Sequence, residues 1–288
     1  MVSVEFKNVN FNIKKEKILN NINLNFEPGK IYGLLGRNGA GKTTLLSLIA
    51  TYQKVTSGEL TVAGENPYEN ERVLPLVNFF HQSNYNDDTD SIKAFFELRQ
   101  LYYPDFNMSY AEDLLAEYKI SRDKKMSSLS QGQASVIEAI MGLATMAPVV
   151  LFDEVTNGMD APSREKFYKQ VLNAKDRENR VIVLSTHMVS EMDYLFDEIT
   201  IIHHGEVLVN ETVDTFLESG YEATGHIEAI KQFSADKNVL HSRTLGTTRA
   251  VSILGQITEE EMQKMDELDI RFAPIKLQDL FINMTDDK

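Results

Sequence analysis

Two separated stretches of this sequence carry the residue types that phosphate chemistry requires. The first, GRNGAGKT from Gly36 to Thr43, fits the pattern G-x-x-x-x-G-K-[ST]. Its glycines let successive backbone N–H groups converge on phosphate oxygens, and Lys42 adds a positive charge over the outer phosphates. The second, VVLFDE, is an apolar run that ends in Asp153 and Glu154. Together they predict a nucleotide site in which Asp153 holds Mg²⁺ and Glu154 orients or deprotonates the attacking water.

The elements around the first stretch are those that position a phosphate loop. The short apolar run IYGLL predicts a strand before the loop, and TLLSLIA predicts a helix after it, whose N-terminus adds a positive dipole end. The Thr43 hydroxyl is expected to bind Mg²⁺. The residues expected to hold ATP in this loop are Gly36, Arg37, Asn38, Gly39, Ala40, Gly41, Lys42, Thr43 and Thr44.

Composition narrows the class of protein. The chain has 288 residues, with 29 Lys and Arg against 43 Asp and Glu, a net charge of −14 that disfavours nucleic acid as a partner. It has no cysteine, so disulfides and thiolate metal sites are excluded. Its longest apolar stretch, Ala139 to Phe152, is shorter than the roughly 20 residues that span a bilayer. We expect a protein of cytosolic character that attaches to a membrane through a partner.

Periodicity along the chain predicts an α/β fold. Alternating stretches before residue 30 read as strands, residues 90–142 read as helices, and VVLFDE and RVIVLSTH read as buried strands. Strand–helix alternation of this kind is typical of a parallel sheet. We predict one domain over residues 1–218, with a helical subdomain at about 83–145. A small α+β appendage is expected over 219–288, with a helix at TEEEMQKMDEL.

Five motifs in this order, GRNGAGKTT, LSQGQ, VVLFDE, NGMD and STH, resemble the ATP-binding cassette (ABC) ATPase family. The resemblance covers residues 1 to about 215. It implies a RecA-like parallel-sheet core with an antiparallel β subdomain and a helical subdomain. It also implies ATP and Mg²⁺ as cofactors and ATP hydrolysis as the activity.

The resemblance assigns roles to residues that would otherwise read as structural. Gln82 in FFHQSN would be a surface glutamine at a strand end, and by resemblance it is the switch glutamine that contacts Mg²⁺ and water. His187 after VIVLST resembles the switch histidine that contacts the γ-phosphate. Asp160 in NGMD resembles the aspartate that crosses between subunits. The implied catalytic residues are Lys42, Gln82, Glu154 and His187, and the implied metal ligands are Thr43, Gln82 and Asp153.

LSQGQ resembles the family's L-S-G-G-Q segment, with Ser130, Gly132 and Gln133 matching and Gln131 in place of a glycine. By resemblance these residues form a second phosphate-binding surface, which closes over ATP held by the loop of another subunit. The chain has one such set, so the resemblance implies a homodimer or heterodimer of ATPase subunits. After Gln133 the sequence ASVIEA lacks the family's usual basic residues. Ile13 stands about where an aromatic residue usually stacks on adenine.

The function implied is the energising subunit of a membrane transporter. Its partner would be a transmembrane permease on a separate chain, at the cytoplasmic face of the cell membrane. The tail PIKLQDLFINMTDDK resembles the ending of ATPases in exporters of drugs, antibiotics or peptides, and it also reads as an amphipathic helix. An importer subunit, or a non-transport ATPase acting on nucleic acid or ribosomes, is the alternative. Aromatic residues of the helical region form either a docking patch for the permease or the subdomain core: Phe95, Phe96, Tyr102, Tyr103 and Phe106.

Overall fold

A computed structural model describes residues 2–81, 83 and 85–286, without the side chains of 176–178. Within these residues the strands are β1 (Val4–Ile13), β2 (Glu16–Phe26), β3 (Lys30–Leu35), β4 (Ser57–Val62), β5 (Val77–His81), β6 (Val149–Asp153), β7 (Val181–Thr186), β8 (Glu198–His203), β9 (Glu206–Thr212), β10 (Gly220–His226), β11 (Asn238–Leu245), β12 (Thr248–Leu254) and β13 (Arg271–Pro274). The helices are α1 (Lys42–Ile49), α2 (Ile92–Tyr102), α3 (Met108–Glu117), α4 (Gln131–Ala144), α5 (Ala161–Glu178), α6 (Val213–Glu218), α7 (Ile227–Phe233), α8 (Glu259–Glu267) and α9 (Leu277–Met284).

The described residues divide into two compact units, 1–187 with 195–210, and 188–194 with 211–288. A sheet of order β5-β6-β7-β3-β8-β9 forms the centre of the first unit. The neighbours from β5 to β8 pair in parallel. All residues of β6 and β7 are buried, as expected for parallel strands covered on both faces. The carboxyl ends of β3, β6 and β7 therefore lie at one edge of the sheet, where their connecting loops meet.

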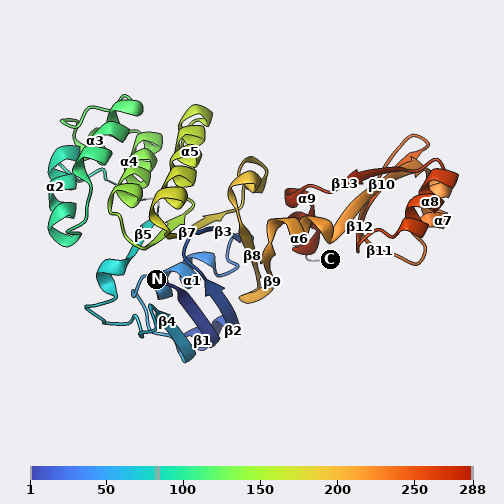
Figure 1. Cartoon of the computed structure of the whole chain (residues 1–288), viewed down its shortest axis with the longest axis horizontal. Coiled ribbons are helices and arrows are strands. Elements are labelled where there is room, and N and C mark those ends of the chain that lie inside the picture. The colour runs from blue at the N-terminus through green and yellow to red at the C-terminus, as the bar shows by residue number, and fades with distance from the viewer. Residues whose placement is uncertain (1, 82, 84, 287–288) are drawn as a thin grey trace. The chain divides into compact units, whose positions relative to one another are not determined.

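A smaller antiparallel sheet of order β2-β1-β4 completes the β structure of this unit. Its buried side chains share a core with α1 and with the central sheet. The helices α2 and α3 lie beside α4, the long helix that packs on β5 and β6 (Figure 1). The predicted α/β fold with a parallel core sheet, an antiparallel β sheet and a helical region is confirmed.

The second unit contains the topology β-α-β-β-α-β, with sheet order β11-β12-β10-β13 and antiparallel pairing throughout. This order is that of a ferredoxin-like split β-α-β fold. Apolar residues of α7 and α8 fill one face of the sheet, among them Ile230, Phe233 and Met265. The predicted helix at TEEEMQKMDEL is α8, which begins with a capping box between Thr258 and Glu261.

Two local predictions concern residues that the structure describes. The chain's last helix, α9, is amphipathic as predicted and buries Leu277, Leu280 and Phe281. The aromatic residues of the helical region differ in burial. Phe96 and Phe106 are buried in the core, Phe95 and Tyr103 are half-buried, and Tyr102 is 69% exposed, so docking by the exposed ring stays a prediction.

Candidate nucleotide-binding site

The phosphate loop lies between β3 and α1, as the sequence predicts. Gly39 and Gly41 have positive φ values of 81° and 111°, a region that glycine adopts without a steric penalty. A Cβ at Gly36 would lie 2.7 Å from the carbonyl oxygen of Ile202. Glycine is therefore required at Gly36 by close packing, and at Gly39 and Gly41 by the turn of the backbone.

Lys42 is the first residue of α1, and its side chain is only 6% exposed. Its ammonium Nζ donates to the carbonyl oxygens of Gly36 at 2.7 Å and Arg37 at 3.4 Å. It also lies 3.6 Å from Oε1 of Glu154. The loop thus wraps around its own lysine, and a positive charge lies among the backbone amides that would face phosphate oxygens.

Asp153 ends β6 and is held by two hydroxyl groups from other elements. Thr43 Oγ1 donates to Asp153 Oδ2 at 2.5 Å, and Ser185 at the end of β7 donates to Oδ1. The carboxylate is 6% exposed. A hydroxyl and a carboxylate side by side form the oxygen donor set that Mg²⁺ prefers when substrate phosphates supply further ligands. Thr43 and Asp153 therefore fit the predicted metal ligands.

Glu154 follows Asp153 with a positive φ of 53°, which turns its side chain away from the end of β6. Its carboxylate accepts from Asn157 Nδ2 at 3.0 Å, and its two oxygens lie 2.9 and 3.0 Å from Nδ1 of His187. The geometry brings His187 and Glu154 together, whereas the contact of His187 with a γ-phosphate stays a prediction. The side chain of Glu154, the candidate base, is 21% exposed.

A pocket of 360 Å³ lies over the phosphate loop. Its lining consists of Ile18, Asn38, Gly39, Ala40, Gly41, Lys42, Thr43, Thr44 and Glu154. The pocket places the candidate base beside the loop that would hold the phosphates. Ile18 on β2 is a lining residue that sequence motifs did not indicate, because β2 comes beside the loop only by packing of the antiparallel sheet against Gly41. Ile13, the residue predicted near adenine, is 47% exposed.

The segment LSQGQ forms the start of α4. Ser130 caps this helix: its Oγ accepts from the Gln133 amide at 3.3 Å, and Oε1 of Gln133 accepts from the Ser130 amide at 3.3 Å. The Gly132 amide lies between them in the first turn, where helix amides have no intrahelical acceptor. Within the described residues, Ser130, Gly132 and Gln133 do not line the pocket over the phosphate loop. The chain therefore carries two distinct surfaces suited to phosphate.

The segment after Glu154 joins these two surfaces. Ser135 on α4 donates its hydroxyl to the carbonyl oxygen of Asn157 at 2.9 Å, and Asn157 in turn donates to Glu154. A Cβ at Gly132 would lie 2.5 Å from the carbonyl oxygen of Gly158, so the segment packs directly on α4. Asn157, Gly158 and Ser135 are residues that sequence motifs did not single out in these roles.

Asp160 begins α5 as its N-cap, where its Oδ1 accepts from the Ser163 amide at 2.9 Å. Hydrogen bonds from the Ser163 hydroxyl and then its amide lower the pKa of Asp160. The side chain is exposed, as a residue that contacts another subunit must be. Gln82, the predicted switch glutamine, lies outside the described residues.

Comparison with known proteins finds a family model and several proteins to which this chain is similar. A family model described as ABC transporter matches residues 19–157. The ABC transporter ATP-binding protein YtrB of Bacillus subtilis (strain 168) is 27% identical over 196 residues, covering 68% of this chain and 67% of that protein. The bacitracin transport ATP-binding protein BcrA of Bacillus licheniformis is 24% identical over 302 residues, covering 93% and 92%.

Solved structures share the fold. That of cbiO1 from Clostridium perfringens, described as part of the ABC transporter complex cbiONQ, superposes with a TM-score of 0.63 at 20% sequence identity. The superposition covers 81% of this chain and 94% of that one. Among the described residues, no helix is both long enough and apolar enough to cross a membrane.

Proposed function

Because the chain belongs to the family of ABC transporter ATP-binding subunits, which are ATPases coupled to transport, we propose that it powers a membrane exporter through ATP-driven dimerisation. The observation that supports this best is the pocket that the phosphate loop and Glu154 line together, with His187 2.9 Å from the Glu154 carboxylate. When bound, ATP with Mg²⁺ supplies the terminal phosphoryl group that water attacks.

In the proposed mechanism each side chain of the site has one task. Lys42 and the loop amides bind the outer phosphates, and Thr43 with Asp153 holds the metal ion. Glu154 accepts a proton from the attacking water, and His187 keeps its carboxylate oriented. General-base catalysis of this kind contributes roughly 10²–10⁴-fold to the rate of proton-coupled steps.

We propose that a second ATPase subunit completes the site. The N-terminus of α4 with Ser130 and Gly132 offers amides to an anion, yet these residues lie away from the pocket over their own loop. In a symmetric pair, the α4 N-terminus of one copy would close over the phosphates held by the other. Asp160, exposed at the start of α5, would lie at the same contact.

The proposed partner is a transmembrane permease on a separate chain, which would hold the ATPase at the cytoplasmic face of the membrane. The exposed Tyr102 in α2 belongs to the surface that would receive it. The proposed cargo is a drug, an antibiotic or a peptide, and the proposed direction is export. The resemblance of the chain's tail to exporter ATPases supports the direction, and the near full-length match to a protein named for bacitracin transport supports the class of cargo.

Co-purification with native membranes tests the proposal. Affinity-tagged chain, extracted in mild detergent, is expected to bring down a hydrophobic polytopic membrane protein in a fixed ratio. The Lys42→Ala variant in the same extract serves as a matched control that should retain the partner but not hydrolyse ATP. Recovery of ribosomal RNA or DNA in place of a membrane protein would contradict the transporter assignment.

A further inference from the structure

One buried carboxyl group in the first unit has no role in the proposed hydrolysis. Glu138 lies in α4 with its side chain 3% exposed, between the buried apolar residues Ile137 and Ala139. Burying a carboxylate costs several kcal/mol unless hydrogen-bond donors compensate, so such a residue in a helix core requires partners.

The partners of Glu138 come from the segment that follows β5. The hydroxyl of Tyr85 donates to Oε1 of Glu138. The pKa of the Glu138 carboxyl is raised above its ordinary value, because burial is the largest influence on it. Hydrogen bonds from Ser83 and Tyr85, and the nearby Arg99 and His81, offset part of this rise. Burial likewise raises the pKa of the Tyr85 phenol, which therefore stays a donor at neutral pH.

Aromatic contacts hold the donor side of this pair in place. The Tyr85 ring meets Phe95 of α2 edge-on, with 5.6 Å between the ring centroids. The guanidinium of Arg99 lies 5.8 Å from the Phe80 ring centroid and 6.0 Å from that of Phe95. The hydrogen bond therefore joins two packed elements rather than two mobile side chains.

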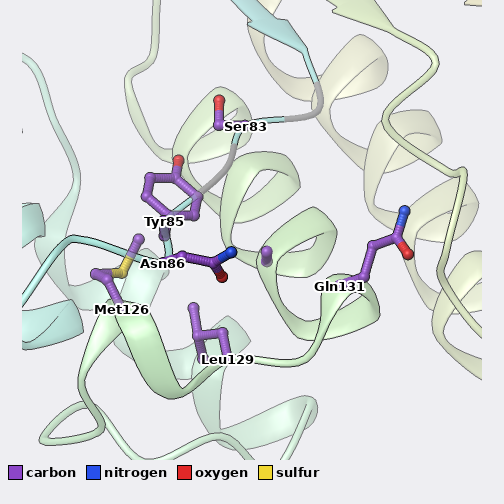
Figure 2. A pocket seen from close by; sticks show the side chains of 7 residues that line it. Ser83, Tyr85, Asn86, Met126, Leu129 and Gln131 are labelled. Atoms are coloured by element: carbon purple, nitrogen blue, oxygen red, sulfur yellow. The ribbon is translucent and has the colours of Figure 1, made fainter.

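Helical spacing connects this bond to the start of α4. Residues four and seven positions apart share one face of a helix, and the face that carries Glu138 also carries Ala134 and Gln131. A pocket of 410 Å³ lies along this face, between α4 and the segment containing Ser83, Tyr85 and Asn86. Figure 2 shows Tyr85 and Asn86 on one side of the pocket and the first turn of α4, with Gln131, on the other. On this side the first turn of α4 therefore borders the pocket. Tyr85 contacts α4 further along the helix, at Glu138.

Another face of α4 is attached to the segment that carries the catalytic base. Ser135 donates to the Asn157 carbonyl oxygen, and the Asn157 side chain donates to Glu154. A shift of α4 would therefore move Ser130, which caps the helix. It would also move Asn157, which donates a hydrogen bond to Glu154.

We propose that the Tyr85–Glu138 hydrogen bond sets the position of α4, and with it the phosphate-binding N-terminus at Ser130 and Gly132, relative to the segment after β5. Tyr85 and Glu138 are positioning residues for closure of the ATP-bound dimer. This inference rests on the proposed shared site, because the α4 N-terminus acts on the nucleotide of a second subunit. Tyr85 belongs to the segment that follows β5, so the bond connects that segment with the LSQGQ helix.

The test compares three quantities in chains that also carry Glu154→Gln, which slows hydrolysis and preserves ATP-bound dimers. Analytical ultracentrifugation with Mg-ATP gives the dimer dissociation constant, calorimetry at low protein concentration gives the ATP affinity of the monomer, and thermal unfolding gives Tm. The variants are Tyr85→Phe, Glu138→Met and the double variant Tyr85→Phe/Glu138→Met. Glu138→Gln retains an acceptor, and Tyr52→Phe, at an exposed tyrosine that follows α1, is the matched control.

Each single variant is expected to lower Tm and to weaken dimerisation about tenfold, the size of one hydrogen bond to a charged group. The double variant removes both polar groups, so Tm should recover, because no buried donor or acceptor is left unpaired. The Ser83 hydroxyl also stays paired in the double variant, because it donates to the His81 carbonyl oxygen at 3.2 Å. Dimerisation should stay weakened, with monomer ATP affinity unchanged, while Glu138→Gln and Tyr52→Phe dimerise like the parent.

Recovery of dimerisation together with Tm in the double variant would show that the pair only stabilises the fold, and would overturn the inference. Loss of monomer ATP affinity in the single variants would also overturn it, because the effect would then lie in the nucleotide pocket. If the parent chain with Glu154→Gln does not dimerise with ATP, the shared-site proposal fails, and this inference fails with it.

Discussion

Replacing Glu154 by glutamine is the most direct perturbation of the proposed chemistry. The amide has the same shape as the carboxylate, so it can still accept from Asn157, whose Nδ2 lies 3.0 Å from Oε2. It cannot accept a proton from water at neutral pH. Removal of a general base lowers kcat by roughly 10²–10⁴-fold, which corresponds to about 3–5 kcal/mol of activation free energy.

Nucleotide binding should survive the same substitution, for a reason found in the geometry. Oε1 of Glu154 lies 3.6 Å from the Lys42 ammonium, so the native carboxylate competes with phosphate for this positive charge. The neutral amide ends that competition, and ATP affinity is expected to be equal to or higher than that of the wild type. Phosphate release under saturating Mg-ATP measures kcat, and calorimetry measures affinity.

The matched control is Glu165→Gln, an exposed carboxylate near the start of α5, which should leave both quantities unchanged. Hydrolysis by Glu154→Gln at the wild-type rate would refute the assignment of the base. A rate loss accompanied by an equal loss of ATP affinity would refute the separation of binding from chemistry, because the substitution would then have disturbed the phosphate loop.

Further predictions concern binding, sharing of the site, packing and pH. Lys42→Ala should lose most of its ATP affinity by calorimetry, since the ammonium lies among the loop amides; an unchanged affinity would be incompatible with the phosphate-loop assignment. A mixture of Ser130→Ala and Lys42→Ala chains should recover ATPase activity that neither has alone, because each mixed dimer keeps one complete site; no recovery in a verified mixed dimer would contradict sharing. Gly132→Ala should lower Tm and slow hydrolysis, because its Cβ would lie 2.5 Å from the Gly158 carbonyl oxygen; wild-type values for both would disprove that packing. The raised pKa of Glu138 means that the folded chain binds more protons above pH 4.5 than the unfolded chain. The unfolding free energy of the wild type should therefore fall, relative to Glu138→Gln, as pH rises from 4.5 through the folded-state pKa; a constant difference in urea titrations would contradict the raised pKa.

The local parts of this protein are determined by its sequence. The order strand, glycine loop and helix around Lys42 is a property of consecutive residues, since glycine permits the positive φ values and the apolar runs specify the flanking elements. The capping box at Ser130 and Gln133 is equally local. These features were predictable because short-range sterics and hydrogen bonding decide them.

Only the tertiary structure decides which side chains from different elements come into contact. Asp153 contacts Thr43 because β6 and β3 are both paired with β7 in one parallel sheet, although the two residues are 110 positions apart. The bond from Ser135 on α4 to Asn157, and the bond between Tyr85 and Glu138, depend in the same way on packing between elements that no periodicity relates. Hydrophobic patterning states which face of a helix is buried, but not which polar group the opposing element presents to it. Nothing in the sequence pairs Glu138 with Tyr85, because these residues are 53 positions apart and meet only in the fold.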